Sequence, residues 1–486
     1  MTTTPKLCVT VTAPTMAELC TARDRVADAD LVELRLDTVR DPDVPRALAG
    51  RTRPVIVTCR AAWEGGQFAG SEEARRALLR QALDHGADYV DVEFRAGFAD
   101  LIAVDPRRIV VSSHDFETMP ADLPERVRAM RATGAAVVKI AGKASSLRDC
   151  VTLLDVATRE RGRGDLILIG MGDHGLATRV LAGRFGSAWT YAGSVASVGQ
   201  VTAEILIDRF RFRRITPQTA IFGLTGAPIS HSVSPAMHNA ACAATGVDAV
   251  YLPFPATDAD DFLALAEALG IAGASITIPY KVPLFERADA VDDTARAIGA
   301  INTVKREGDR WIGRNTDLPG FLNPLDQRGC SLAGARVSVL GAGGAARSVA
   351  YGAAGRGARV TVHARDAERA RPVAALAHAE VGPWPPVPGS WDLLVNTTPV
   401  GMHPRTDASP ITIPSGSRGV VYDLIYNPGE TALLRQAAAA GCTTIGGLDM
   451  LVEQAIEQFA WWTGVRPPAA PMRAAALARL AEFTDR

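Results

Sequence analysis

Cysteine is scarce in this sequence, and the cysteines present are arranged neither for cross-linking nor for metal binding. Seven of the 486 residues are cysteine, at positions 8, 20, 59, 150, 242, 330 and 442, and no two are separated by only two residues. An odd number of scattered cysteines is typical of reduced thiols inside a cell. We therefore expect neither disulfides nor a bound metal.

An excess of charge and a long apolar run are absent as well. Lysine and arginine number 52 against 53 for aspartate and glutamate, and a net charge of -1 gives no reason to expect a nucleic-acid partner. No apolar stretch approaches the roughly 18 residues of a membrane span, and the first residues lead directly into a strand pattern. The sequence predicts a soluble cytoplasmic protein that acts on small molecules, as a monomer or a homodimer.

Short apolar runs, in contrast, are abundant in the first part of the chain. The 486 residues exceed the roughly 250 to 300 that one hydrophobic core supports, so two or three domains are expected. Apolar, β-branched runs recur at 7–12, 31–36, 54–59, 89–94, 109–113, 136–140, 166–171 and 187–191, with alanine-rich helical segments between most of them. This alternation predicts an α/β fold whose parallel strands close into a (β/α)8 barrel.

Reactive side chains of such a barrel belong at the C-terminal ends of its strands. The charged residues gather there: Glu33 and Arg35 in the second run, Arg60 just after the third, Glu93 near the end of the fourth, His114 after the fifth and Lys139 within the sixth. Taken singly, each also fits an ion pair that fills the barrel.

The sequence around Lys139 indicates a catalytic role for this residue in preference to a simple ion pair. It stands in Ala135-Ala-Val-Val-Lys139-Ile-Ala, where we expect aliphatic neighbours to desolvate the amine and favour its neutral, nucleophilic form. A buried lysine in a barrel strand indicates imine formation with a ketone. His114, in Ser112-Ser-His114-Asp-Phe116, supplies a group that titrates near neutral pH and can carry the proton.

The barrel motifs resemble the type I 3-dehydroquinate dehydratase family, from residue 6 to about residue 212. The resemblance is carried by Glu33-Leu-Arg35-Leu-Asp37, Cys59-Arg60-Ala-Ala-Trp-Glu64-Gly-Gly, Ser113-His114-Asp-Phe, Val138-Lys139-Ile-Ala, and Arg179 before Phe185-Gly-Ser-Ala. It implies that Lys139 forms a Schiff base with the C3 ketone. It also implies that His114 removes the C2 proton and then protonates the departing C1 hydroxyl.

The same resemblance implies roles for the residues around this pair. Arg179 would bind the substrate carboxylate, and the hydroxyls and the histidine would be oriented by Glu33, Arg35, Arg60 and Glu64. Gln200 falls on the loop that closes over the substrate. In that loop the family's Ser-Ala-Pro-Gly-Gln reads Ala196-Ser197-Val-Gly-Gln200, so the family's serine contact is either displaced by one position, to Ser197, or lost.

A dinucleotide site is predicted where the apolar run 336–340 breaks into Gly341-Ala342-Gly343-Gly344-Ala345-Ala346. Gly341 permits a tight turn, Gly343 lets the backbone approach a pyrophosphate, and the small Ala346 lets helix and strand pack closely. A helical register follows, and then a second strand at 358–363. This strand, turn and helix context makes the glycine motif specific.

Between the barrel and this turn lie further polar motifs. Ser232 and Ser234 stand just before a helix start, where they can grip a carboxylate or simply cap the helix. Lys281 and Asp317 both follow strand segments, and they are suitable parts of a proton relay at a carbonyl or alcohol. A surface salt bridge is the alternative for that pair.

Read together, these motifs resemble the shikimate dehydrogenase family across residues 220–486. The resemblance implies that Ser232 and Ser234 bind the shikimate carboxylate and that Lys281 and Asp317 handle the proton at the C3 oxygen. Other implied contacts are Thr277, Asn302, Tyr426 and Gln454 for the substrate, and Thr397, Met402 and Gly447 for the cofactor.

The end of the second strand of the dinucleotide fold bears on cofactor choice. An acid there commonly holds the ribose of NAD, whereas arginine suits the 2′-phosphate of NADP. The chain reads His363-Ala-Arg365-Asp366-Ala-Glu-Arg369, and Arg365 with Arg369 can clamp a phosphate. Asp366 can instead neutralise the patch or contact a free hydroxyl. We favour NADP(H).

These parts predict a barrel over 1–212, a linker at 213–219, a shikimate-binding domain over 220–330, a Rossmann domain over 331–447 and C-terminal helices over 448–486 that return to the substrate domain. The predicted function is dehydration of 3-dehydroquinate to 3-dehydroshikimate and its NADPH-dependent reduction to shikimate, for aromatic amino acid biosynthesis. One alternative is an NAD-linked quinate/shikimate dehydrogenase of catabolism fused to a dehydratase. Another is that one half is an inactive scaffold.

Overall fold

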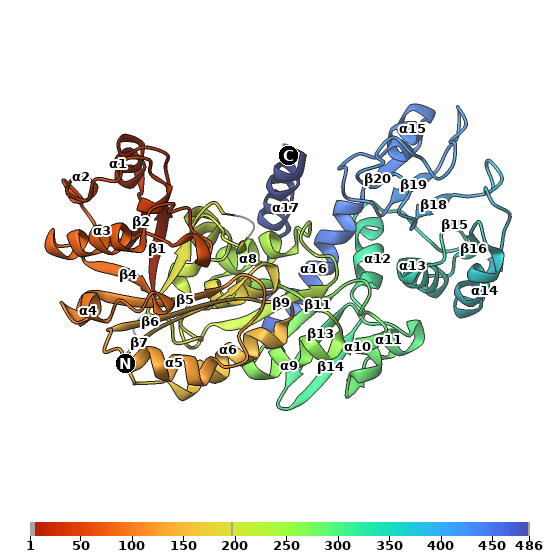
Figure 1. Cartoon of the computed structure of the whole chain (residues 1–486). Helices are drawn as coiled ribbons and strands as arrows, with labels where there is room; N and C mark the ends of the chain where they lie inside the picture. The colour runs from red at the N-terminus through yellow and green to blue at the C-terminus, as the bar shows by residue number, and fades with distance from the viewer. Residues whose placement is uncertain (1–4, 196–197, 485–486) are drawn as a thin grey trace. The chain divides into compact units, whose positions relative to one another are not determined.

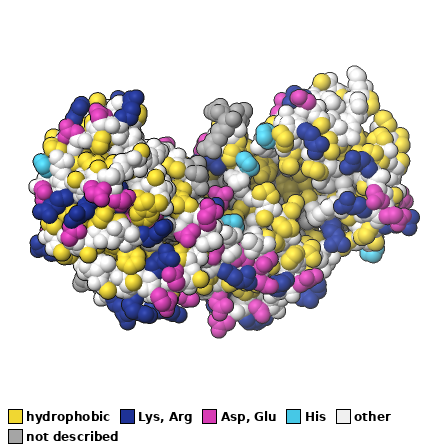
Figure 2. Space-filling view, in the orientation of Figure 1, with side chains coloured by type: hydrophobic (Ala, Val, Ile, Leu, Met, Phe, Trp, Pro, Cys, Tyr) yellow, Lys and Arg dark blue, Asp and Glu magenta, His cyan; other side chains and the backbone are white. Residues whose placement is uncertain are grey.

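The computed structural model describes residues 5–195 and 198–484, which divide into two compact units (Figure 1). The first unit comprises Met1–Ile221 and Asp248–Ile271, and the second comprises Phe222–Val247 and Ala272–Arg486. Charged side chains of both signs are interspersed over the face shown in Figure 2. Among the described residues, no helix is long and apolar enough to span a membrane.

Eight parallel strands form the sheet of the first unit. They are β1 (Lys6–Val11), β2 (Leu31–Arg35), β3 (Val55–Thr58), β4 (Tyr89–Glu93), β5 (Ile109–Asp115), β6 (Val137–Lys143), β7 (Asp165–Met171) and β8 (Trp189–Ala192), in the order β7-β6-β5-β4-β3-β2-β1-β8. The two ends of the sheet meet at one bridge, between Leu166 and Ser187. The strands are buried on both faces, as in β3, which is typical of a parallel sheet covered by helices. The predicted α/β barrel is confirmed.

Helices and short turns link these strands. They are α1 (Met16–Arg25), α2 (Val44–Leu48), α3 (Glu72–Asp84), α4 (Ala99–Ile102), α5 (Leu123–Arg131), α6 (Leu147–Arg159) and α7 (Leu176–Val180), with the 3-10 turn η2 (Ala62–Glu64) after β3. Side chains of Thr15 and Ser71 cap α1 and α3, which satisfies backbone donors that a helix start leaves free.

The position predicted for His114, after the fifth strand, is wrong. His114 lies within β5, because the ladder with β6 continues to the pair of Asp115 with Gly142. Ser112 pairs with Lys139 in the same ladder, so His114 lies two residues farther toward the C-terminal end on the neighbouring strand. Residues two apart on a strand point to the same face, and His114 therefore shares the face of Ser112.

The first unit also includes β10 (Ala249–Pro255) and α9 (Ala259–Leu269). Asp261 of α9 is fully buried, and its carboxylate accepts the backbone N–H groups of Leu147 at 3.1 Å and Arg148 at 2.9 Å. A carboxylate from α9 thus caps α6, the helix that follows the strand of Lys139.

A mixed sheet in the order β10-β9-β11-β13-β14-β12 follows the barrel. Its further strands are β9 (Ala220–Gly226), β11 (Gly273–Ile276), β12 (Ala290–Val291), β13 (Thr303–Glu307) and β14 (Arg310–Arg314), accompanied by α8 (Ser234–Thr245), α10 (Pro283–Arg287), α11 (Asp293–Ile298) and α12 (Asp317–Gln327). Strand β11 is parallel to β9 and antiparallel to β13.

The last sheet is parallel and has the order β17-β16-β15-β18-β19-β20. Its strands are β15 (Arg336–Leu340), β16 (Arg359–His363), β17 (Glu380–Val381), β18 (Leu393–Asn396), β19 (Val420–Asp423) and β20 (Thr443–Ile445), and its helices are α13 (Gly344–Gly355), α14 (Ala367–Leu376) and α15 (Ala432–Ala440). This is the doubly wound order of dinucleotide-binding folds. Helices α16 (Gly447–Thr463) and α17 (Ala469–Thr484) follow, and α16 contacts α12.

Candidate active sites

Lys139 lies inside the barrel among polar groups. Its side chain is almost fully buried, with Nζ 3.0 Å from Asp91 Oδ2 and 3.5 Å from Glu33 Oε1. The ring of Tyr191 lies below it, with its centroid 4.2 Å from Nζ. The aliphatic surroundings predicted for Lys139 are therefore wrong, because its neighbours come from β2, β4 and β8 rather than from its own segment.

Glu64 holds His114 at two points. Its Oε1 lies 2.9 Å from Nδ1 of the imidazole and accepts the backbone N–H of the same residue at 3.0 Å. Burial raises the pKa of Glu64 to about 7, and burial together with the charge of Arg60 lowers the pKa of His114 well below its ordinary value. When Glu64 is ionised, Nδ1 carries the proton that it donates, and Nε2 is left with a lone pair.

Arg60 sits at the centre of a buried group of carboxylates. Its guanidinium lies 3.1 Å from Asp91, 3.1 Å from Glu93 and 3.7 Å from Glu64, and it donates to Ser112 Oγ at 2.8 Å. Burial alone would raise the pKa of Asp91, but the charges of Arg60 and Lys139 outweigh it and lower that pKa well below its ordinary value. Asp91 is therefore ionised beside Lys139.

Glu33 and Arg35 lie on the same strand but have different partners. Glu33 accepts hydrogen bonds from Thr58 Oγ1 at 2.9 Å and Thr10 Oγ1 at 2.9 Å, next to Lys139. Arg35 pairs with Asp37 through two hydrogen bonds, at 2.9 and 2.8 Å. Of these two predicted substrate contacts, only Glu33 touches Lys139.

Arg179 is a buried cation without a carboxylate partner among the described residues. It donates to the carbonyl oxygens of Val198 at 2.9 Å and Tyr191 at 3.4 Å, and its Nε has no partner there. Burial lowers its pKa to about 10. Gln200 accepts the N–H of Val195 at 3.1 Å, whereas Ser197 lies outside the described residues. An unpaired buried guanidinium is suited to an anionic ligand.

Lys281 and Asp317 form the polar centre of the second unit. Lys281 Nζ lies 2.5 Å from Asp317 Oδ2, and Asn302 Nδ2 donates to Asp317 Oδ1 at 2.8 Å. Asn302 Nδ2 is also 3.4 Å from Gln454 Oε1 of α16. Four side chains predicted for the site are thus in one connected group.

The remaining predicted substrate contacts of this unit lie on neighbouring elements. Ser232 Oγ accepts the N–H of Ser234, the first residue of α8, at 3.2 Å, so it satisfies part of the helix start. A Cβ on Gly226 would come within 2.3 Å of Thr277, which places Thr277 against β9. Tyr426 is half-buried, and burial raises its pKa. Among the described residues, none of these side chains hydrogen-bonds to Lys281 or Asp317.

The glycine turn after β15 is shaped for a pyrophosphate. Gly341 has a φ of 114°, and a Cβ there would come within 2.5 Å of Thr397 Oγ1. A Cβ at Gly343 or Gly344 would meet nothing within 4 Å, so the start of α13 is open. Gly447 packs against the carbonyl of Leu424, where a Cβ would approach to 2.3 Å. Open backbone N–H groups at a helix start suit a dinucleotide.

At the end of β16 the arginines and the acid have separate environments. Arg365 and Arg369 are exposed, as is Met402 in the loop after β18. Asp366 is the N-cap of α14, and its side chain accepts the N–H of Glu368 at 3.0 Å. One oxygen of this exposed carboxylate therefore caps the helix that follows.

Several residues of these sites escaped the sequence analysis. Asp91 contacts both Lys139 and Arg60, Arg75 contacts Glu93, and Thr316 donates its N–H to Asn302 Oδ1 at 2.7 Å. The signal for Asp91 was present, since Asp91-Val-Glu93 puts two carboxylates on one face of a strand that is buried on both sides.

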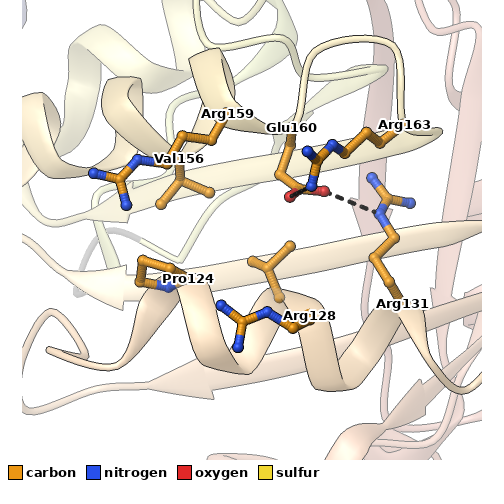
Figure 3. Close-up of a pocket in the computed structure, with 8 residues that line it drawn as sticks. Pro124, Arg128, Arg131, Val156, Arg159, Glu160 and Arg163 are labelled. Atoms are coloured by element: carbon orange, nitrogen blue, oxygen red, sulfur yellow. Dashed lines mark hydrogen bonds and ion pairs between the residues drawn. The ribbon is translucent and has the colours of Figure 1, made fainter.

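A cavity of about 400 Å³ lies on the outside of the barrel between α5 and α6 (Figure 3). It is lined by Pro124, Val127, Arg128, Arg131, Val156, Arg159, Glu160 and Arg163. Glu160 lies 3.4 Å from Arg131 and 3.7 Å from Arg163. This cavity contains none of the predicted site residues, and its lining sets four arginines against the single carboxylate of Glu160.

The fold and these centres define an α/β enzyme that joins a (β/α)8 barrel with a buried lysine to a doubly wound dehydrogenase. Residues 7–217 match the type I 3-dehydroquinase family, residues 224–304 match the substrate-binding domain of shikimate dehydrogenase, and residues 447–477 match the shikimate 5′-dehydrogenase C-terminal domain. The chain belongs to the family of bifunctional 3-dehydroquinate dehydratase/shikimate dehydrogenases.

Individual relatives cover either the whole chain or its second half. The chloroplastic bifunctional enzyme of Arabidopsis thaliana is 34% identical over 501 residues, covering 94% of this chain and 82% of that protein. The NADP(+) shikimate dehydrogenase of Symbiobacterium thermophilum is 45% identical over 280 residues, covering 54% of this chain and 94% of that protein. A Thermus thermophilus shikimate dehydrogenase solved with NADP(H) and shikimate is 35% identical at a TM-score of 0.50, covering 54% of this chain and 99% of that chain.

Proposed function

We propose that the chain catalyses two consecutive reactions of the shikimate pathway. The barrel dehydrates 3-dehydroquinate to 3-dehydroshikimate, and the second half reduces that product to shikimate with NADPH. One observation carries the first reaction: Lys139 Nζ is 3.0 Å from an ionised Asp91 in a barrel whose fifth strand also presents the His114–Glu64 pair. Membership of the bifunctional family supports both reactions.

In the barrel, the Lys139 amine, once it has released its proton to solvent, attacks the C3 ketone, and loss of water leaves an iminium. His114 Nε2 then takes the C2 proton, and the C2–H electron pair moves toward the iminium nitrogen, which acts as the electron sink. Glu64 fixes the imidazole by accepting from Nδ1 and from the backbone N–H.

Departure of the C1 hydroxyl completes the dehydration. The electron pair of the enamine expels the hydroxyl, which leaves as water with the proton that His114 returns. Hydrolysis of the conjugated iminium then restores the Lys139 amine and releases 3-dehydroshikimate. Arg179, buried with a free Nε, pairs with the substrate carboxylate, and Gln200 and Ser197 are assigned to substrate binding. The hydroxyls are oriented by Glu33, Arg35 and Arg60.

Purified chain supplied with 3-dehydroquinate and NADPH tests both reactions at once. It should consume NADPH and accumulate shikimate, and borohydride should trap a covalent substrate adduct on the barrel. Lys139→Ala should abolish the adduct and the use of 3-dehydroquinate but keep the use of 3-dehydroshikimate. Lys143→Ala is the matched control, because Lys143 is exposed at the end of the same strand. Unchanged dehydration by Lys139→Ala would rule out the Schiff base.

In the second half, Lys281 and Asp317 move the proton at the C3 oxygen. Their separation of 2.5 Å lets either residue pass a proton to the other. Asn302 and Gln454, joined to this pair, bind ring hydroxyls together with Thr277 and Tyr426, while Ser232 and Ser234 bind the carboxylate.

The cofactor of the second reaction is NADP(H), which supplies the hydride when bound. The open helix start and the glycine turn fit its pyrophosphate. The residues that would hold it are Gly341, Ala342, Gly343, Gly344, Ala345, Arg365, Arg369, Thr397, Met402 and Gly447. Rates with quinate against shikimate, and with NAD against NADP, decide between this function and an NAD-linked quinate dehydrogenase.

We propose the division into barrel, linker, shikimate-binding domain, Rossmann domain and returning helices at the boundaries given above. A reducing, cytoplasmic location is proposed from the cysteines, all of which are free thiols.

A further inference from the structure

Arg75 is a fully buried arginine on α3, outside the lining of the barrel. Its Nη1 pairs with Glu93 Oε2 and donates to the carbonyl of Cys59 at 3.2 Å, and its Nη2 lies 2.6 Å from Glu72 Oε2. The guanidinium also lies over the ring of Phe98, 4.9 Å from its centroid. Three hydrogen-bonding directions and one ring face thus fix this side chain.

The partner of Arg75 leads directly to the reacting groups. The two oxygens of Glu93 are divided, since Oε2 faces Arg75 and Oε1 accepts from Arg60 Nη1 at 3.1 Å. Arg60 in turn contacts Asp91, which pairs with Lys139, and lies 3.7 Å from Glu64, which holds His114. Arg75 is therefore one carboxylate away from Arg60, which is itself two contacts away from each catalytic group.

Arg75 adds a second positive charge beside the buried carboxylates that surround Arg60. Asp91, Glu93 and Glu64 all face Arg60, and the side chain of Glu93 is fully buried. Without Arg75, the whole charge of Glu93 would act on Arg60 and draw its guanidinium away from Asp91 and Ser112. A buried carboxylate that loses one of two cations binds the other more strongly or takes up a proton.

We propose that Arg75 is a positioning residue of the dehydratase: by holding Glu93 from behind, it keeps Arg60 directed toward Asp91, Ser112 and the substrate. This inference rests on the proposed function of Arg60 and Glu64. A residue of helix α3, outside the strands that carry the catalytic groups, would thus help to orient those groups.

A lysine at position 75 could not make all of these contacts at once. The guanidinium presents donors in a fixed fork, so Arg75 reaches Glu93, Cys59 and Glu72 at once, whereas an ammonium offers a single charged atom. Arg75→Lys should keep the charge but loosen Glu93, and its activity should fall between those of the parent chain and Arg75→Met.

The test compares Arg75→Met with Arg80→Met in the full-length chain. Arg80 is on the same helix, is exposed and pairs with Asp84 at 3.0 Å, so it controls for loss of a helix arginine. Arg75→Met should lower kcat/KM for 3-dehydroquinate about tenfold to a hundredfold, the effect of misplacing a group near the reaction. Arg80→Met should leave it unchanged, and shikimate oxidation by the second half should be equal in both variants.

The pH profile gives a second readout that a purely structural role would not move. Losing one positive charge from the buried cluster should raise the pKa of Glu64, so the acid limb of kcat/KM should shift to higher pH in Arg75→Met. An unshifted limb with normal kcat/KM would overturn the proposal.

A double-mutant cycle with Glu93→Gln covers the case in which Arg75→Met alone does not fold. If Arg75 acts through Glu93, the double variant should be no worse than Glu93→Gln alone, since no unpaired carboxylate remains. A further tenfold loss in the double variant contradicts this route.

The Arg60→Lys variant distinguishes a failure of the role proposed for Arg75 from a failure of the role proposed for Arg60. If Arg60→Lys leaves dehydration intact, the role proposed for Arg60 fails. If Arg60→Lys is impaired but Arg75→Met behaves as Arg80→Met, only the role of Arg75 fails.

Discussion

Glu64 and His114 are joined twice through a single oxygen, which accepts from Nδ1 at 2.9 Å and from the backbone N–H at 3.0 Å. An ionised carboxylate oxygen accepts both bonds more strongly than the oxygen of a protonated carboxyl does. The hold on the catalytic imidazole is therefore firmest when Glu64 is ionised.

Dehydration should depend on pH through Glu64. Its pKa is raised by burial from 4.5 to about 7, so the carboxylate that orients His114 is lost as the pH falls below about 7. We expect kcat/KM for 3-dehydroquinate to rise with pH through this value. Glu64→Gln should be less active and should lack that limb, and an identical pH profile would exclude the assignment.

Glu64 should also make the free energy of unfolding depend on pH. Because its folded-state pKa lies above the ordinary 4.5, protonated Glu64 contributes stability that is full below pH 4.5 and is lost as pH rises through about 7. Denaturant titrations of the parent chain and Glu64→Gln should therefore differ in slope against pH within this window.

His114→Ala should separate proton transfer from imine formation. Lys139 remains in place beside Asp91, so borohydride should still trap an adduct with 3-dehydroquinate. Turnover should fall by roughly a hundredfold or more, as expected when a general acid–base group is lost. Mass spectrometry of the trapped species and steady-state rates give the two readouts, and normal turnover would dismiss the proton-carrier role.

Changes at Lys281 and Asp317 should be strongly non-additive. Lys281 Nζ and Asp317 Oδ2 are 2.5 Å apart and act on the same substrate oxygen in the proposed relay, so either single change to alanine should remove most of the relay. The double change should cost little beyond the worse single one, and NADPH affinity should hardly change. Simple addition of the two losses would mean that the pair binds substrate without acting as a unit.

Arg365 and Asp366 should differ in their effect on cofactor choice. A charge-assisted contact with the 2′-phosphate is worth about 1.5 to 3 kcal/mol, so Arg365→Ala should weaken NADP binding roughly tenfold to a hundredfold. NAD binding should be little affected. Asp366→Ala removes the cap of α14 and should cost about 1 kcal/mol of stability with unchanged preference; a switch in preference would contradict this assignment.

The strands and the glycine turn were predictable because their signals are local. Runs of β-branched residues mark β2 to β7 within one or two residues at most ends, and the turn at Gly341 reads directly from the sequence. The surroundings of Lys139 were not predictable in this way. Asp91 and Glu33 lie 48 and 106 positions from Lys139, so only closure of the barrel brings their carboxylates to the amine.

The capping role of Asp366 has a local signal in the sequence. An aspartate directly before a helix start commonly caps it, and the residues after Asp366 form α14. Arg75 gave no comparable signal, because an arginine in a polar helix usually faces solvent. Its burial follows from the carboxylate of Glu93 behind β4, which a helical pattern alone does not reveal.

The bond from Asp261 to α6 has a practical consequence for separating the two activities. A recombinant fragment that stops at residue 219 would keep every strand of the barrel yet lose the carboxylate that accepts the N–H groups of Leu147 and Arg148. Those two N–H groups would then be left to water, while the capping box of Ser146 and Asp149 would remain. A barrel expressed alone would therefore gain stability from a substitute acceptor for these two N–H groups.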